Sequence, residues 1–318
     1  MHDASPSRPS RGAAADWLTQ QWVKATGRRM RRDELAFLDG PAGDPSGIGG
    51  EFFERWAARS GLALVRDGAA RGLIPEFDRL RGPTFDPDAV HPEVRAFYER
   101  TSEYELEAWS EWCGAFRPFG RLLAVVFSRR LQQLNVPLDP LDTSHGTTSE
   151  VVHLVDSASG QAVMAAWIRR LRRTGHVLYA GSYAVGHPPG HPGPCVKVVF
   201  PLPNGNGIVL LRPEVDAGGA LTVVSSGRAF GDPGFYFTVH GPGNRVWARY
   251  VRTMQESIRV YPVPADEGGG VRADHTMRIW GRVFLRLHYR LRTSGDRRQE
   301  AGDREGLKAH ERNARGPS

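Results

Sequence analysis

Residues 282–291 read RVFLRLHYRL, and this stretch decides the fold. Five of its apolar side chains occupy every second position: Val283, Leu285, Leu287, Tyr289 and Leu291. The charged and polar side chains fall between them: Arg282, Arg286, His288 and Arg290. A period of two is that of a β-strand with one face on a core and the other in water. We therefore expect the C-terminal part of the chain to form a sheet that covers a core.

Short runs of β-branched and aromatic residues precede this stretch from Pro140 onward, and Gly, Pro and Asn separate them. Residues 203–207 (PNGNG) and 216–219 (DAGG) are typical of hairpin turns. Short strands without intervening helices favour a curled antiparallel β-sheet or a β-barrel over a parallel sheet. The strands are predicted at 150–155, 162–169, 176–185, 195–202, 207–213, 220–225, 234–240, 244–251, 256–262 and 271–291, the last bent near Gly281.

Residues 13–140 read mainly as helix, for example at 51–56 (EFFERW), with Gly61 as a helix stop. The clearest helix is predicted over 119–135, where apolar residues recur at three- and four-residue steps, and it could flank or plug the sheet. The fold class is therefore α+β, with an N-terminal helical segment followed by a curled antiparallel β-sheet or β-barrel. The expected organisation is a disordered arm (1–12), a helical region (13–90), a helix plus barrel-like domain (91–292) and a disordered tail (293–318).

Charge and composition narrow the class of protein. The net charge of +7 is concentrated at the ends of the chain, with about +5 in residues 1–32 and about +3 in residues 290–318, which argues against a nucleic-acid partner for the middle. The two cysteines, Cys113 and Cys195, are too few for a disulfide framework. The sequence shows neither a membrane-spanning apolar stretch nor the apolar part of a secretory signal, so we expect a cytoplasmic protein.

The sequence lacks the signature motifs of the large nucleotide-binding, hydrolase and zinc-protease classes, and we expect no cofactor. Residues 186–195 (GHPPGHPGPC) contain two histidines and a cysteine, which are ligand types for zinc or copper. Four prolines and the lack of a fourth ligand favour an exposed hairpin loop instead, so we expect no metal. Asp142, Ser144 and His145 are too close in sequence to suggest a catalytic triad and fit a connecting loop.

Two further stretches allow both a structural and a functional interpretation. Residues 91–113 are dense in aromatic side chains, which favours core packing over a ligand-binding wall. Residues 167–173 (WIRRLRR) could contact phosphates, but they read more simply as two strands meeting at a solvated turn.

The most informative stretch for a site is 225–237 (SSGRAFGDPGFYF), followed by charged and aromatic residues on the next strand. If that strand places Trp247 and Arg249 on one side, a buried Arg249 would need an anionic partner. Asp232, Glu256 or a ligand carboxylate could supply it, and an interior ion pair that only fixes strand register is the alternative. The candidate ligand-binding residues are Asp232, Tyr236, Trp247, Arg249 and Tyr250.

Two residues are candidates for acid–base chemistry. His275 has a side chain whose ordinary pKa suits proton transfer near neutral pH, and Glu256 is a carboxylate on a neighbouring predicted strand. The structural alternative for His275 is a hydrogen-bonded residue in the wall of the sheet. Glu256 and His275 are the predicted catalytic residues.

Several stretches give the chain a resemblance to an uncharacterised actinobacterial protein family over roughly residues 70–292: 97–99 (FYE) through 119–120 (FG), 199–205 (VFPLPNG) and 230–236 (FGDPGFY). More loosely, the predicted helix and the strands ending in 284–290 (FLRLHYR) resemble a domain of unknown function appended to some saccharopine-dehydrogenase-like proteins. Neither resemblance implies an activity or a catalytic residue.

Three functions stay open on these grounds. The first is binding of a lipophilic or carboxylate-bearing metabolite in a barrel-like domain. The second is a cofactor-independent isomerase, cyclase or lyase that uses Glu256 or His275 as base, with Arg249 or Tyr250 stabilising negative charge. The third is an adaptor that binds acidic partners through its basic ends. The sequence does not predict an oligomeric state.

Overall fold

The computed structural model describes residues 14–43, 51–67, 70–114, 147–172, 174–175, 177–267 and 269–293. Its helices are α1 (Ala14–Thr26), α2 (Phe52–Ser60) and α3 (Pro92–Glu99), joined by short 3-10 segments that include η1 (Arg32–Leu38), η2 (Phe77–Leu80) and η3 (Pro87–Ala89). Its strands are β1 (Arg28–Arg31), β2 (Leu62–Val65), β3 (Tyr104–Trp112), β4 (Thr147–Asp156), β5 (Ala162–Leu171), β6 (Val177–Gly186), β7 (Cys195–Leu202), β8 (Gly205–Val215), β9 (Leu221–Val224), β10 (Gly234–His240), β11 (Arg245–Tyr250), β12 (Met254–Pro262), β13 (Val271–Ile279) and β14 (Arg282–Thr293).

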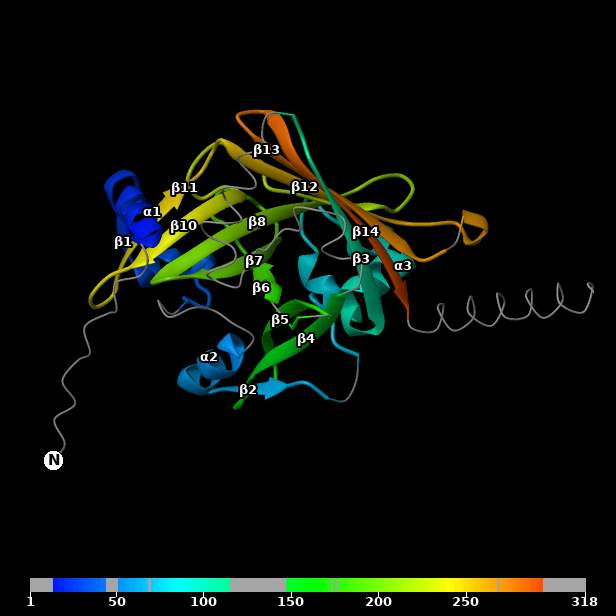
Figure 1. Ribbon diagram of the computed structural model, residues 1–318, viewed down its shortest axis with the longest axis horizontal. Helices are drawn as coiled ribbons and strands as arrows, with labels where there is room; N and C mark the ends of the chain where they lie inside the picture. The colour runs from blue at the N-terminus through cyan, green and yellow to red at the C-terminus, as the bar shows by residue number, and fades with distance from the viewer. Residues whose placement is uncertain are drawn as a thin grey trace, which may run out of the picture.

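The strands form one large antiparallel sheet in the order β2-β4-β5-β6-β7-β8-β9-β12-β13-β14-β3 (Figure 1). The sheet divides at the long strand β8, whose first half pairs with β10 and whose second half pairs with β9. Strands β11 and β1 continue the β10 branch. At the far end of the main path β3 lies close to β4, but in the described ranges the two are not paired, so the sheet curls without closing. The α+β class with a curled antiparallel sheet is confirmed at this level.

The predicted strands 195–202 and 234–240 coincide with β7 and β10, and Gly61 ends α2 in the left-handed conformation as expected. The single bent strand over 271–291 is wrong, because β13 and β14 form a hairpin. Trp280 and Gly281 both have positive φ, of 49° and 75°, which is the backbone of a two-residue hairpin turn. A tryptophan rarely occupies such a position, so Gly281 alone indicated only a bend and not a hairpin turn.

The mainly helical reading of 13–140 is wrong in part. Strands β1, β2 and β3 lie in that range, and β3 covers much of the aromatic block. Strand β3 forms because it adds to the edge of the sheet beside β14, a long-range pairing that local sequence pattern does not reveal. The predicted helix over 119–135 lies outside the described residues, as do the arm 1–12 and all but the first residue of the tail 293–318.

The inner face of the curled sheet holds the largest apolar core. Side chains from β4, β5, β7, β8, β9, β12, β13 and β14 contribute to it, and segment 73–106 closes one part of it with residues such as Phe77, Val94 and Phe97. Phe97, Tyr98 and Tyr104 are buried here, so the core-packing interpretation of the aromatic block is confirmed for these three. On the outer face, α2 covers β4–β6 and η1 covers β7, β8 and β10–β11.

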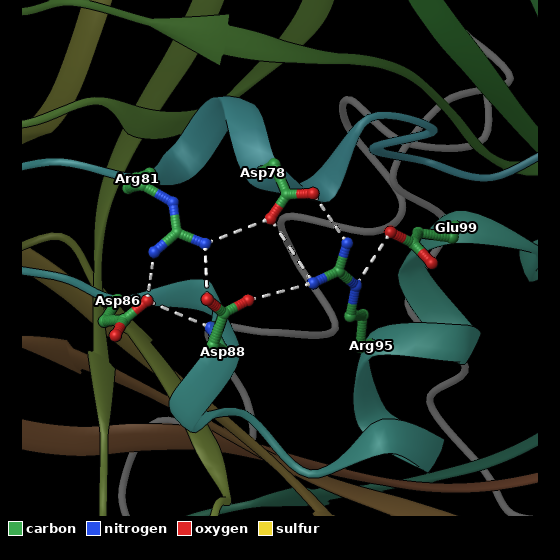
Figure 2. A network of polar contacts seen from close by, with 6 residues as sticks. All are labelled: Asp78, Arg81, Asp86, Asp88, Arg95 and Glu99. Carbon is green, nitrogen blue, oxygen red and sulfur yellow. Dashed lines mark hydrogen bonds and ion pairs between the residues drawn. The ribbon is translucent and has the colours of Figure 1, made fainter.

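A surface network of charged side chains joins the short helices of segment 73–106, which we call the closing segment (Figure 2). Arg81 at the end of η2 bonds to carboxylates on both sides of η3, at 2.5 Å from Asp86 and 2.8 Å from Asp88. Arg95 of α3 lies 2.8 Å from Asp78 of η2 and 3.0 Å from Glu99 one turn along its own helix. Each exposed pair contributes little alone, but the shared arginines hold η2, η3 and α3 together over the core.

Candidate functional site

The inner face carries a buried acid–base pair contributed by adjacent strands. Glu256 on β12 and His275 on β13 both point inward, because they alternate with residues on the outer face. The Oε2 atom of Glu256 lies 3.0 Å from Nε2 of His275, and the side chains are only 8% and 13% exposed. The structure therefore brings together the two predicted catalytic residues.

Ser225 fixes the backbone of Glu256. The amide of Glu256 donates to the Ser225 hydroxyl at 2.8 Å, and the amide of Ser225 donates to the carbonyl of Glu256 at 3.0 Å. These bonds hold the start of β12 against the end of β9. The carboxylate of Glu256 is consequently presented from a rigid strand rather than from a loop.

Tyr289 extends this group along β14. Its ring stacks on the His275 imidazole, with centroids 6.5 Å apart and planes 25° from parallel. Burial raises the pKa of Tyr289 to about 12, and the negative charge of Glu256 adds to that rise while Arg169 opposes it. Tyr289 is therefore neutral at physiological pH and can donate a hydrogen bond.

Arg169 brings a positive charge to the same interior from β5. It is 8% exposed, and its guanidinium lies 5.9 Å from the centre of the Trp167 ring. Burial lowers the pKa of Arg169, and the hydroxyls of three tyrosines, Tyr289, Tyr179 and Tyr183, oppose this shift. Arg169 therefore interacts electrostatically with tyrosines of two strands, β6 and β14.

Tyr179 and Tyr183 on β6 complete the cluster. Their hydroxyls lie 2.7 Å apart, and both rings pack edge-on against Trp167. Burial raises the pKa of both tyrosines well above the ordinary value, and the charge of Glu256 contributes to the rise for Tyr179. We call these six residues the inner polar cluster: Arg169, Tyr179, Tyr183, Glu256, His275 and Tyr289.

A small cleft borders this cluster between the closing segment and strands β5 and β6. Tyr183 lines it from β6, together with Ala165 and Met164 of β5. Leu73 and Ile74 supply its opposite wall. One member of the inner polar cluster is therefore adjacent to a surface opening.

The predicted ligand-binding residues fall into two groups on opposite sides of β10 and β11, away from the inner polar cluster. Tyr236 is fully buried against η1, where its hydroxyl accepts from the Gly231 amide at 2.9 Å and donates to the Asp232 carbonyl at 2.5 Å. The Asp232 carboxylate accepts from the amides of the loop residues Arg228 and Ala229. The Tyr250 hydroxyl donates to the Pro233 carbonyl at 3.4 Å. Each of these side chains shapes the 227–234 loop.

Trp247 and Arg249 lie on the other side of β11, beneath α1. Lys24 of α1 sits 5.3 Å from the centre of the Trp247 ring. Arg249 donates from Nη1 to the carbonyl of Thr26 at the end of α1, at 2.9 Å. Arg249 therefore binds a helix carbonyl, where the expected partner was a carboxylate of Asp232, Glu256 or a ligand. A cation at a helix C-terminus is favourable, so this contact fixes α1 on the sheet.

Other predicted features resolve into structural roles. Residues 187–194 connect β6 to β7, as the hairpin-loop interpretation proposed. Cys195 is buried with its Sγ 3.9 Å from Nδ1 of His191, and burial raises the pKa of the thiol to about 12. Within the described ranges no three His, Cys, Asp or Glu side chains gather as a metal site requires. Residues 141–146, including His145 of the predicted connecting loop, lie outside the described residues.

Sequence reasoning missed Arg169, Tyr179, Tyr183 and Tyr289 as site residues. Arg169 was the last residue of a strand predicted to end at a solvated turn, but β5 runs on to Leu171 and the turn begins only at Arg172. The available signal was the period-two spacing of Trp167, Arg169 and Leu171, which places Arg169 on the same face as a buried tryptophan.

Comparison with known proteins gives one relative. The chain is 25% identical over 233 residues to the "Uncharacterized membrane protein YndJ" of Bacillus subtilis (strain 168), an alignment that covers 69% of this chain and 38% of that protein. No family model matches the chain, and no solved structure matches it. Among the residues that the structure describes, none of the helices has the length and apolar character needed to cross a bilayer. The chain thus spans less than two fifths of the curated relative that it resembles.

Proposed function

We propose that the inner face of the curled sheet binds a small molecule that carries an anionic group, such as a carboxylate, on an apolar body. The observation behind this proposal is the burial of Arg169 among three tyrosines, opposite the Glu256–His275 pair. Clusters of perturbed titratable groups are more frequent at functional sites than elsewhere.

The tyrosines define the kind of group that fits. Because burial raises the pKa values of Tyr179, Tyr183 and Tyr289, their hydroxyls are protonated at neutral pH and can donate to an anion. Arg169 adds a planar donor suited to a carboxylate. Aliphatic side chains of the surrounding core, such as Ile258 and Met277, would contact the apolar part. No cofactor enters this proposal.

A second candidate is a cofactor-independent enzyme at the same place, an isomerase, cyclase or lyase. The hydrogen bond between Glu256 and His275 favours it, because a carboxylate that holds an imidazole is a common arrangement for proton transfer. Arg169 and Tyr289 would stabilise negative charge on the substrate in place of the Arg249 and Tyr250 expected from the sequence. Binding alone requires Arg169, whereas catalysis also requires His275. The adaptor reading gains no support from the described residues.

The first test is native mass spectrometry of the full chain purified from its own or a related host. The same sample is then denatured to release any bound molecule. We expect a stoichiometric small acid with the wild type and its loss with Arg169→Met. If the variants Glu256→Gln and His275→Ala keep the bound acid but no longer convert it, the protein is an enzyme that acts on this acid. A wild type with no bound molecule, and no shift in melting temperature across a panel of small carboxylic acids, would contradict the binding proposal.

The β13–β14 hairpin, which carries His275 and Tyr289 on its inner face, supplies a matched control. On its outer face the Nδ1 atom of His288 lies 2.6 Å from the Asp274 carboxylate, an arrangement chemically like that of the inner pair. The variants His288→Ala and Asp274→Asn therefore remove the same kind of interaction between β13 and its other neighbour, β14. We expect them to leave the bound molecule in place. Equal loss of ligand from outer and inner variants would mean that the hairpin, and not the inner polar cluster, was responsible.

A further inference from the structure

Helix α1 turns its largest apolar side chains toward solvent. Trp17, Leu18 and Trp22 are 59%, 65% and 40% exposed. These positions, together with Ala25, share one side of a helix of 3.6 residues per turn. An ordinary surface helix shows the opposite pattern, with apolar residues inward and polar residues outward.

The side of α1 that faces the protein is correspondingly polar. Asp16 is buried, and Gln20 donates from its side-chain amide to the carbonyl of Pro203 at 3.1 Å. Val23 is the apolar residue in the middle of this side, and it is almost completely buried. Packing among the residues that the structure describes therefore does not explain the exposed tryptophans and leucine.

The helix is held firmly in this orientation. The ring of Trp22 makes an edge contact with Phe237 of β10, with centroids 6.0 Å apart. The bond from Arg249 to the Thr26 carbonyl anchors the C-terminal end of α1, and Lys24 rests on Trp247. Figure 1 shows α1 lying along β11 and β10 at one end of the molecule.

Arginines flank the exposed apolar side chains. The register of β1 and β11 pairs Arg29 with Trp247 and Arg31 with Arg245. Because side chains alternate along a strand, these arginines lie on the same side of the sheet as Trp247, which is the side that α1 covers. Arg29 and Arg245 are exposed, and Arg31 is paired with Asp33 at 3.1 Å. Residues 14–32 carry one acidic and five basic side chains, and the acidic one, Asp16, is buried.

We propose that this surface docks onto an anionic lipid bilayer. We define the α1 surface as Trp17, Leu18, Trp22, Arg29 and Arg245. Tryptophan is favoured at the boundary between headgroups and acyl chains, leucine inserts below it, and arginine binds lipid phosphates. The helix lies flat in the interface with its apolar side buried and does not span the membrane.

Charge selects a bilayer over a second copy of this chain. A symmetric dimer through the α1 surface would bring the arginines of both copies together in a partly desolvated contact, which is repulsive. An anionic bilayer offers apolar depth and negative charge at once. Docking does not depend on the inner polar cluster, so the two proposals can fail independently.

The test is co-sedimentation of the full chain with two kinds of vesicle, phosphatidylcholine alone and phosphatidylcholine mixed with phosphatidylglycerol. We expect binding to the mixed vesicles, weak binding to the neutral ones, and a decrease as salt is added. The double variant Trp17→Ser, Leu18→Ser should lower the partition constant for mixed vesicles about tenfold or more, since each loses apolar contact with the bilayer. Trp22 is left unchanged because it also packs on Phe237.

The charge variant is Arg29→Glu with Arg245→Glu, which should lower binding to mixed vesicles about tenfold and leave the weak neutral binding unchanged. The matched controls are Trp280→Asn, which removes a tryptophan that is 71% exposed at the β13–β14 turn, and Arg282→Glu beside it. Both controls should bind like the wild type. Melting temperatures of all variants check that the fold is intact.

Three results would overturn the proposal. One is no binding of the wild type to mixed vesicles. Another is an equal loss of binding in the control and α1-surface variants. The third is a dimer in solution that the Trp17→Ser, Leu18→Ser variant dissociates, because the occupant of the surface would then be a second copy.

Discussion

Glu256 and His275 form a 3.0 Å contact between neighbouring strands on the inner face of the sheet, at positions displaced by two residues in the β12–β13 register. Such diagonal neighbours are within reach of long side chains. Strand geometry therefore supports the contact directly, without a loop. The pair is positioned as firmly as the sheet itself.

Tyr236 is predicted to stabilise the fold and to play no part in ligand binding. Its hydroxyl satisfies the amide of the buried Gly231 and the carbonyl of Asp232. Replacing it with Phe leaves a buried amide without its partner, which should lower the free energy of unfolding by about 1–3 kcal/mol. Urea denaturation measures this loss. A variant as stable as the wild type that no longer carries a bound molecule would reverse the assignment.

Gly205 is predicted to be required by backbone packing. A Cβ at this position would lie 1.9 Å from the carbonyl oxygen of Thr238 on the paired strand β10, and a backbone carbonyl cannot move aside cheaply. Gly205→Ala should cost about 3 kcal/mol of stability. Gly207 on the same strand is the control, because a Cβ there makes only ordinary contacts. Similar melting temperatures for Gly205→Ala and Gly207→Ala would contradict the prediction.

The Arg95–Asp78 pair is predicted to couple α3 to η2 (Figure 2). A double-mutant cycle with Arg95→Met and Asp78→Asn should give a favourable coupling energy, larger than that of an isolated surface pair, because Arg95 is partly shielded and held by a second carboxylate. The coupling should shrink in high salt. The comparison pair is Arg55–Glu51 on α2, whose atoms lie 3.5 Å apart at the surface. Equal coupling in the two pairs would argue against a role for the network.

Acid is predicted to destabilise the protein through His153. Burial lowers the pKa of His153, whose Nε2 lies 2.9 Å from the Gly72 carbonyl. The unfolded chain binds a proton at about pH 6.5, whereas the folded chain does so only at lower pH. Between these values the unfolded state holds more protons, so stability falls as the pH drops below about 6.5.

Urea denaturation of the wild type and of His153→Gln from about pH 7.5 to about pH 5 measures this effect. Glutamine can still donate to Gly72 but does not titrate, so the variant should lose less stability on acidification. His240 retains part of the slope, because burial lowers its pKa as well. Parallel stability curves for the two proteins would show that His153 contributes nothing to the pH dependence.

A substitution at Trp280 in the β13–β14 turn is predicted to stabilise the protein. Trp280 adopts a φ of 49°, a conformation that asparagine tolerates and most other residues avoid. Trp280→Asn creates an Asn-Gly hairpin turn and should raise the free energy of unfolding by about 0.5–1 kcal/mol. Trp280→Val should lower it, because a β-branched residue resists positive φ. Melting temperatures in the order Asn, Trp, Val would support the prediction, and any other order would count against it.

Much of the sheet could be predicted from local pattern. Strands such as β7 and β10 have strongly apolar or aromatic sequences bounded by Gly, Pro or Asn, and their limits follow from those residues. The same holds for Gly61, where the left-handed backbone at the end of α2 favours glycine. The turn at Trp280 and the edge strand β3 escaped prediction. The first lacks the usual turn residue, and the second is a strand because β14 offers it an edge.

The candidate site shows the same division. Sequence named Glu256 and His275 individually, and alternation along each strand predicts which face each occupies. It grouped them with Arg249 and Tyr250, which β11 carries elsewhere on the sheet. Which residues meet across the interior depends on the curl of the sheet, and the curl depends on pairings between strands far apart in the chain.

The sequence by itself determined the strand periodicity, most turns and the α+β class, because these depend on neighbours within a few residues. The tertiary structure decided that β8 divides the sheet, that Arg169 faces Tyr289 across the interior, and that α1 leaves Trp17 and Leu18 in solvent. These are outcomes of long-range packing, in which each side chain competes for burial with the whole chain. A short stretch of sequence therefore cannot predict them.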